Sequence, residues 1–155
     1  MMNPRTHSIS AGITLLELIF VLGIIGTLVA LAQSSYSAYR NTVNIAQAVS
    51  DIASISTAID HNTLVEGLPP PPSLASIGMD GMLDPWGNPY QYINHSLTPK
   101  GQWRKDRFIV PINSDYDLYS MGPDGKSVAP LTAATSRDDI IRANDGAYVG
   151  PASSY

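Results

Sequence analysis

The chain has 155 residues, which is enough for one domain with one modest hydrophobic core. Its formal charge of −4 and its pI of about 5.1 argue against a nucleic-acid binder, because phosphate binding requires a basic face. The absence of cysteine excludes a disulfide framework, a zinc–thiolate site and a cysteine nucleophile. The three histidines are scattered without the spacing of transition-metal ligands.

The N-terminal part of the sequence is unusually apolar. Between Gly12 and Ala32 the only charged residue is Glu17. The run 13–32 has about 20 residues, which as a helix covers a hydrocarbon core of roughly 30 Å. A secretory signal has a shorter apolar core of about 7–15 residues, although Ala30-Leu31-Ala32 resembles its type of cleavage site. The preceding leader carries Arg5, which favours the cytoplasmic side.

Glu17 needs an explanation, because a carboxylate near the centre of an inserted helix costs roughly 2.5–3.5 kcal/mol. One explanation is that Glu17 lies near the helix end and reaches the lipid headgroups. Another is that cleavage before Ile13 creates an α-amine four residues away. Amine and carboxylate could then neutralise each other, within one chain or between neighbours, in a low-dielectric setting. We favour the second explanation.

The segment Gly12-Ile13-Thr14-Leu15-Leu16-Glu17-Leu18, with the apolar run after it, resembles the class III signal of type IV pilins and pseudopilins. In that family a prepilin peptidase cleaves after the glycine and methylates the new N-terminus, and the glutamate at the fifth mature position guides assembly. The resemblance therefore implies that Gly12 ends the leader, Ile13 begins the mature chain and Glu17 is the assembly carboxylate. Ile13 departs from the usual Phe or Met. The implied parts are a leader (1–12), a transmembrane and assembly helix (13–33) and a periplasmic or extracellular domain (34–155).

Two small-xxx-small pairs lie on the apolar helix, Gly23 with Thr27 and Gly26 with Ala30. Such pairs let helix backbones approach closely within a membrane. Glycine is also common in membrane helices for other reasons, and the sequence supports the two explanations equally.

The helix is predicted to continue into the polar part of the chain, because no breaker occurs before Gly67. Gly67 is a C-terminal cap, and the prolines at 69–72 forbid continuation. The expected helix over 14–66 is about 80 Å long at 1.5 Å per residue. One face of its second half carries an apolar stripe at spacings of four, three, three and four. The stripe consists of Ile45, Val49, Ile52, Ile55 and Ile59.

Three later segments are rich in β-branched or aromatic residues and predict short strands, at 90–93, 107–112 and 116–120. Three short strands cannot bury both faces alone, so we expect them to pack on the apolar stripe. The predicted fold is α+β. A long N-terminal α-helix, with a membrane half and an amphipathic half, packs on a small antiparallel sheet with an extended C-terminal loop region.

Two motifs indicate a branch of the family, Asp-Pro-Trp-Gly-Asn-Pro-Tyr-Gln-Tyr at 84–92 and Tyr-Asp-Leu-Tyr-Ser-Met-Gly-Pro-Asp-Gly at 116–125. Together with the N-terminal signal they resemble the major pseudopilins of type II secretion systems. Major pseudopilins lack the cysteine pair of many pilins, as does this chain.

Six aspartates lie after residue 113. Calcium takes six to eight oxygen ligands, which loops can supply. A solvated acidic surface is the alternative, and the spacing is not that of an EF-hand. The region 122–155 has few apolar anchors, so an ion could offset the entropy cost of ordering it. These aspartates are Asp115, Asp117, Asp124, Asp138, Asp139 and Asp145.

In the major pseudopilins a calcium ion secures the C-terminal loop. The resemblance implies as its ligands here the Met121 carbonyl, Asp124, Asp138 and Asp139. Two departures bear on this ligand set: the loop 126–137 is longer than in typical members, and the tail 140–155 replaces a short terminus that ends in tryptophan.

Other function classes have less support. The sequence contains no nucleophile-elbow motif that would indicate an enzyme. Basic residues around Trp103 (Lys100, Arg104, Lys105 and Arg107) suit single-stranded nucleic acid, as in a DNA-uptake pilin, but a solvated hairpin rim explains them more simply. A solitary membrane anchor would need neither Glu17 nor the glycines. The alternative within the family is a type IV pilus subunit for adhesion, motility or DNA uptake.

The resemblance also implies partners and a location. The partners are further copies of the chain in a helical homopolymer, a prepilin peptidase, an inner-membrane assembly platform, minor pseudopilins, and membrane lipid before assembly. The location is the bacterial inner membrane, crossed once, and then a filament in the periplasm or at the surface.

Overall fold

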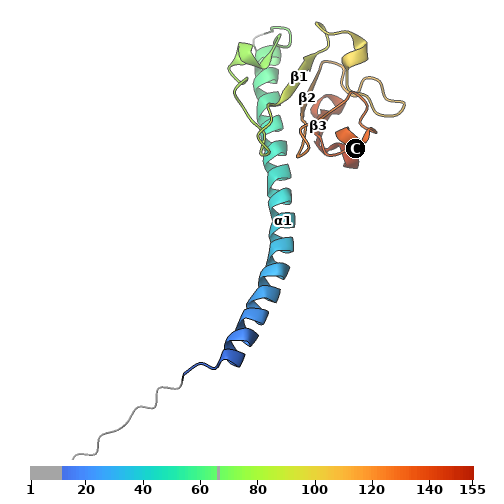
Figure 1. Ribbon diagram of the computed structural model, residues 1–155. Coiled ribbons are helices and arrows are strands. Elements are labelled where there is room, and N and C mark those ends of the chain that lie inside the picture. The colour runs from blue at the N-terminus through green and yellow to red at the C-terminus, as the bar shows by residue number, and fades with distance from the viewer. Residues whose placement is uncertain (1–11, 66) are drawn as a thin grey trace, which may run out of the picture. The chain divides into compact units, whose positions relative to one another are not determined.

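The computed structural model describes residues 12–65 and 67–155 (Figure 1). The predicted leader, apart from Gly12, and the predicted helix end at residue 66 lie outside the described residues. The described residues divide after Arg40 into two compact units, which are considered separately.

The principal helix, α1, comprises Leu15–Asp60, and a π-helical turn, His61–Val65, follows it. The predicted long helix is thus confirmed. Gly67 has φ of +68°, and the backbone N–H of Leu68 donates to the Asn62 carbonyl at 3.3 Å. This bond and the left-handed glycine end the helix in the manner expected of a C-terminal cap.

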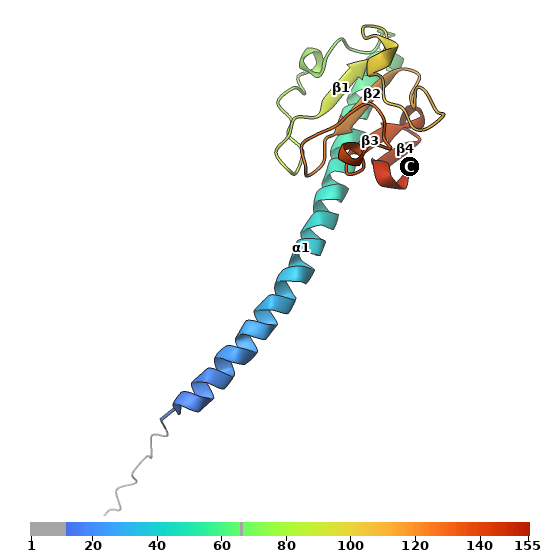
Figure 2. The same cartoon turned by 45° about the vertical axis from the view of Figure 1, so that its right-hand side comes forward.

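Unit 41–155 contains a four-stranded antiparallel sheet in the order β1-β2-β3-β4. The strands are Gln91–Asn94, Tyr116–Ser120, Ile140–Ala143 and Tyr148–Pro151. Each strand pairs with the next along the chain, with Tyr92 opposite Leu118 and Ile141 opposite Gly150. Figures 1 and 2 show this sheet beside the second part of α1.

The sheet has an apolar layer on each face, because side chains alternate along a strand. The larger layer lies between α1 and the sheet, where Ile52 and Ile55 of the predicted stripe are completely buried. The other members of this core are Ala48, Ile59, Leu74, Tyr90, Tyr116, Leu118 and Ile140. The second layer covers the opposite face and consists of Ile112, Leu131, Ile141, Ala143 and Ala152.

The predicted strand at 107–112 is wrong. Arg107 has φ of +41°, and the backbones of Asp106 and Ile109 hydrogen-bond to each other across a tight turn. Phe108, at the tip, is 99% exposed. Pro111 within this run lacks an N–H for a strand ladder, which already argued against a strand.

The expectation that residues 122–155 form loops with few apolar anchors is also wrong. This region supplies β3 and β4 and most of the second core. A tight connection joins the two strands, in which Asn144, Asp145 and Gly146 all have positive φ. An Asp-Gly pair between two apolar runs is a strong hairpin signal, and the sequence reasoning missed it.

Candidate functional site

The first candidate site is the start of α1, where processing and assembly are predicted. Gly12 and Ile13 precede the helix and are exposed. The hydroxyl of Thr14 accepts the backbone N–H of Glu17 at 3.2 Å, and the Thr14 carbonyl accepts the N–H of Leu18 at 3.1 Å. Thr14 is therefore the N-cap, a role that the sequence reasoning missed although Thr-x-x-Glu is a capping-box pattern. Glu17 lies in the first turn, where a negative charge is favourable.

Among the described residues, one helix is long and apolar enough to cross a membrane, judged by length and composition. None of the apolar stretch of this helix is buried within the chain. A core helix of a water-soluble protein would be mostly buried. The observation is therefore compatible with the predicted membrane anchor.

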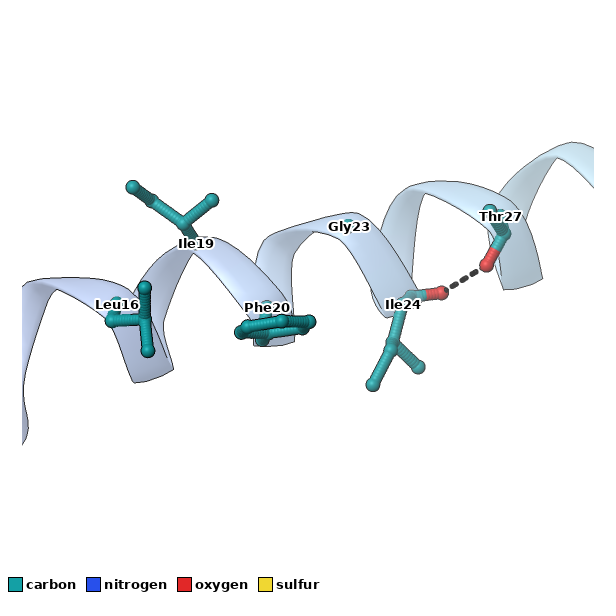
Figure 3. Close-up of a pocket in the computed structure, with 6 residues that line it drawn as sticks. All are labelled: Leu16, Ile19, Phe20, Gly23, Ile24 and Thr27. Atoms are coloured by element: carbon teal, nitrogen blue, oxygen red, sulfur yellow. Dashed lines mark hydrogen bonds between the residues drawn. The ribbon is translucent and has the colours of Figure 1, made fainter.

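A shallow apolar hollow lies on this helix at Gly23 (Figure 3). A Cβ atom added at Gly23 would meet nothing within 4 Å, so the hollow is open. The hydroxyl of Thr27, the only side-chain hydroxyl that lines the hollow, donates to the Ile24 carbonyl at 2.8 Å, so its hydrogen-bonding need is met within the helix. The hollow and the Gly23–Thr27 pair thus suit close approach of a second helix. Its other lining residues are Leu16, Ile19 and Phe20.

The second candidate site is the predicted calcium loop. Asp139 is 0% exposed and forms an ion pair with Arg104, while the Ser127 hydroxyl donates to the same Asp139 oxygen at 2.6 Å. Burial raises the pKa of Asp139 to about 6, although the hydrogen bonds from Ser127 and Arg104 act in the opposite direction. This carboxylate is therefore already engaged by a cation that belongs to the protein.

Asp124 and Asp138 lie close together, but each also accepts a backbone N–H. The N–H of Asp124 donates to Asp138 at 3.2 Å, and the N–H of Lys126 donates to Asp124 at 2.8 Å. Gly122 makes this packing possible, since a Cβ there would lie 2.4 Å from the Asp138 carbonyl oxygen. Met121, half-buried, immediately precedes this turn.

As arranged, these residues do not fit the predicted ion. Asp139 is paired with Arg104, and Asp124 and Asp138 cap a backbone turn. Within 12–65 and 67–155, no group of three or more acidic or histidine side chains is placed to hold a metal ion. Calcium binding itself stays a prediction.

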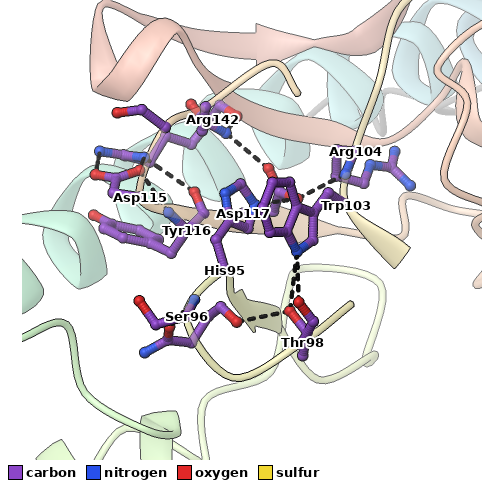
Figure 4. Close-up of polar contacts among 12 residues, drawn as sticks. His95, Ser96, Thr98, Trp103, Arg104, Asp115, Tyr116, Asp117 and Arg142 are labelled. Atoms are coloured by element: carbon purple, nitrogen blue, oxygen red, sulfur yellow. Dashed lines mark hydrogen bonds and ion pairs between the residues drawn. The ribbon is translucent and has the colours of Figure 1, made fainter. Parts of the chain in front are cut away.

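A buried polar network, which sequence reasoning missed, lies around Asp117 of β2 (Figure 4). Asp117 accepts the Arg104 N–H at 2.7 Å and the Asn113 amide at 3.0 Å, and its carboxylate lies 3.0 Å from His95 Nε2. The His95 ring stacks on Trp103 with centroids 4.2 Å apart. The network joins the long β1–β2 connection to the sheet.

A second ion pair, between Arg142 and Asp115, joins β3 to the residue before β2 (Figure 4). Two guanidinium nitrogens of Arg142 donate to the Asp115 carboxylate at 2.8 and 2.9 Å. The guanidinium also lies 4.0 Å from the centroid of the Tyr116 ring. Because the buried arginine is paired and stacked, its charge is offset within the fold.

The two tryptophans, Trp86 and Trp103, have structural roles. Trp86 is partly buried against the core between α1 and the sheet. Trp103 stacks on His95, and its indole N–H donates to Thr98. Arg104 is buried and is therefore unavailable to a nucleic acid or to a solvated rim.

An exposed apolar helix that begins beside a Gly-Ile junction and continues into a small α+β domain defines the class of type IV pilin-like proteins. Comparison with known proteins makes the assignment more specific. The chain is 31% identical over 135 residues to the type II secretion system core protein G of Escherichia coli (strain K12). This alignment covers 74% of the chain and 83% of that protein. It is 32% identical over 146 residues to core protein G of Aeromonas hydrophila, covering 81% and 90%. The relative in Pseudomonas aeruginosa is 30% identical over 136 residues, covering 75% and 85%.

The chain therefore belongs to the type II secretion system core protein G family, the major pseudopilins. No family model matches it, and no solved structure matches it significantly. The resemblance seen in the N-terminal signal and the two internal motifs is thus confirmed.

Proposed function

We propose that this protein is the major pseudopilin of a type II secretion system, a structural rather than catalytic subunit of a pilus-like helical filament. The observation that carries the proposal is its similarity to core protein G along about three quarters of the chain. An apolar helix with one carboxylate in its first turn supports the same function.

The proposed pathway begins in the inner membrane, crossed once by the first part of α1, with the C-terminal domain outside the cytoplasm. A prepilin peptidase cleaves between Gly12 and Ile13 and methylates the new N-terminus. The Ile13 amine and Glu17 then pair, within one chain or between copies. The chain leaves the lipid to join further copies of itself through the assembly platform and minor pseudopilins.

Deletion of the gene in its own organism tests this function. We expect proteins normally found in the culture medium to accumulate in the periplasm, with recovery when the gene is returned on a plasmid. Mass spectrometry of the medium and the periplasm provides the measurement. Undisturbed secretion, together with loss of surface filaments, motility or DNA uptake, would instead assign the chain to a type IV pilus.

A further inference from the structure

Arg104 contacts the C-terminal part of the domain at several points, although it lies in the connection between β1 and β2. It is 1% exposed. Its Nη1 donates to the Ser127 hydroxyl at 2.5 Å and to the Val128 carbonyl at 2.6 Å, and its Nη2 donates to Asp139. The guanidinium also lies 4.2 Å from the centroid of the Tyr119 ring in β2.

These contacts join three segments of the chain: the connection between β1 and β2, strand β2, and the connection between β2 and β3. Ser127 and Val128 lie in the connection between β2 and β3, and Asp139 immediately precedes β3. The N–H of Arg104 is fixed by the Asp117 carboxylate of β2 (Figure 4). One buried cation therefore holds a carboxylate, a hydroxyl and a carbonyl from the region that follows β2.

We propose that the Arg104 guanidinium is the cation that secures the C-terminal region of this chain, in the role that the family resemblance gives to a calcium ion. Both cations neutralise a buried carboxylate and bind backbone and side-chain oxygens. The guanidinium belongs to the chain, so it acts without a free ion. The proposal concerns how this domain is closed, and it can fail while the proposed function stands.

The arrangement around Asp139 also makes the binding of a calcium ion there unfavourable. A calcium ion at Asp139 would lie next to the guanidinium, and like charges repel strongly in a buried setting. One Asp139 oxygen, Oδ1, has no hydrogen-bond partner in the structure, and it is the only oxygen of this carboxylate left for an ion. The calcium response of the protein therefore decides between the two cations.

The full chain in detergent should be melted by differential scanning calorimetry in excess calcium and in EGTA. We expect one melting temperature in both conditions. Arg104→Met should lower it by about 10 °C or more, because it leaves a buried carboxylate unpaired. Lys105→Met, which removes the neighbouring and less buried cation, is the matched control and should shift it by a few degrees at most.

A coupling measurement covers the case in which Arg104→Met folds poorly. Arg104→Met combined with Asp139→Leu removes both charges, so it should melt higher than Arg104→Met alone. A wild-type protein that melts clearly higher in calcium than in EGTA overturns the proposal. An Arg104→Met protein that melts at the wild-type temperature in EGTA also overturns it. A double variant whose loss in melting temperature equals the sum of the two single losses overturns it as well.

Discussion

The Thr14 hydroxyl accepts the backbone N–H of Glu17 at 3.2 Å. This contact fixes the start of α1 two residues after the predicted cleavage point, so Gly12 and Ile13 lie in non-helical backbone. It also gives the Glu17 backbone a structural role that is separate from its charge. The two roles can be tested with different substitutions.

Cleavage is expected between Gly12 and Ile13, because these two exposed residues precede the helix cap. The mature protein should begin at Ile13 and carry one added methyl group. Intact mass and N-terminal sequencing provide the measurement. An N-terminus at Met1, or after Ala32, would contradict the prediction.

Glu17→Gln should impair filament assembly while membrane insertion is retained. A neutral amide is easier to insert than a carboxylate, and only the charge pairing with the Ile13 amine is lost. Sedimentation of sheared filaments and membrane fractionation measure the two properties.

Thr14→Val is the control for Glu17→Gln, since it removes the cap but keeps the charge. It should cost about 1 kcal/mol of helix stability and leave most filaments intact. Normal filaments from Glu17→Gln would refute the assembly role of the charge.

Gly23→Leu should also reduce filament yield, by filling the hollow shown in Figure 3. A Cβ atom added at Gly23 meets nothing within 4 Å, so the substitution creates no backbone clash, and folding and insertion should not change. A neighbouring helix that packs closely at this point would be displaced. Val21→Leu, away from the hollow, is the control, and equal filament yields for both variants would exclude the hollow as a contact.

The helix, its apolar stripe and two strands could be predicted because their signals are local. The spacing of Ile52, Ile55 and Ile59 is itself the pattern of a buried helix face, and all three are completely buried. The position of Gly12, Ile13 and Glu17 at the start of the helix could be predicted for the same reason, while their roles in processing and assembly stay predictions. By contrast, residues 107–112 have strand composition but form a turn, because Pro111 cannot continue a ladder.

The buried polar contacts could not be predicted, because they join residues far apart in the sequence. Arg104 contacts Asp139, 35 positions away, and nothing in the sequence near Arg104 distinguishes it from the less buried basic residues around it. The acidic pair at 138–139 was interpreted as part of a metal site because the sequence gives the charge of an aspartate but not the group with which it pairs.

Stability should fall at high pH, and Tyr116 should account for part of this loss. Burial raises the pKa of Tyr116 to about 12, from an ordinary value of 10.0. Between these values the unfolded state loses the phenol proton first, so the free energy of unfolding decreases as pH rises. One such group contributes a slope of about 1.4 kcal/mol per pH unit.

Tyr116→Phe should reduce that slope by about the contribution of one group. Denaturant unfolding of the full chain in detergent, at several pH values from about 9 to about 12, gives the slope, because this range includes the ordinary tyrosine pKa of about 10. Tyr36→Phe, at an exposed position of α1, is the control. An unchanged slope in Tyr116→Phe would mean that this phenol does not titrate with folding.

The last prediction concerns the stripe that joins α1 to the sheet. Ile52 is completely buried in the core that includes Leu118 of β2, so Ile52→Ala leaves a cavity that neighbouring side chains fill only in part. The free energy of unfolding should fall by about 2–5 kcal/mol. Val43→Ala removes an exposed apolar side chain from the same helix and should cost less than about 1 kcal/mol. Guanidinium unfolding followed by tryptophan fluorescence reports on this unit, since Trp86 and Trp103 both lie within it. Similar losses in the two variants would mean that the stripe does not hold the sheet, and that the helix contributes through its propensity alone.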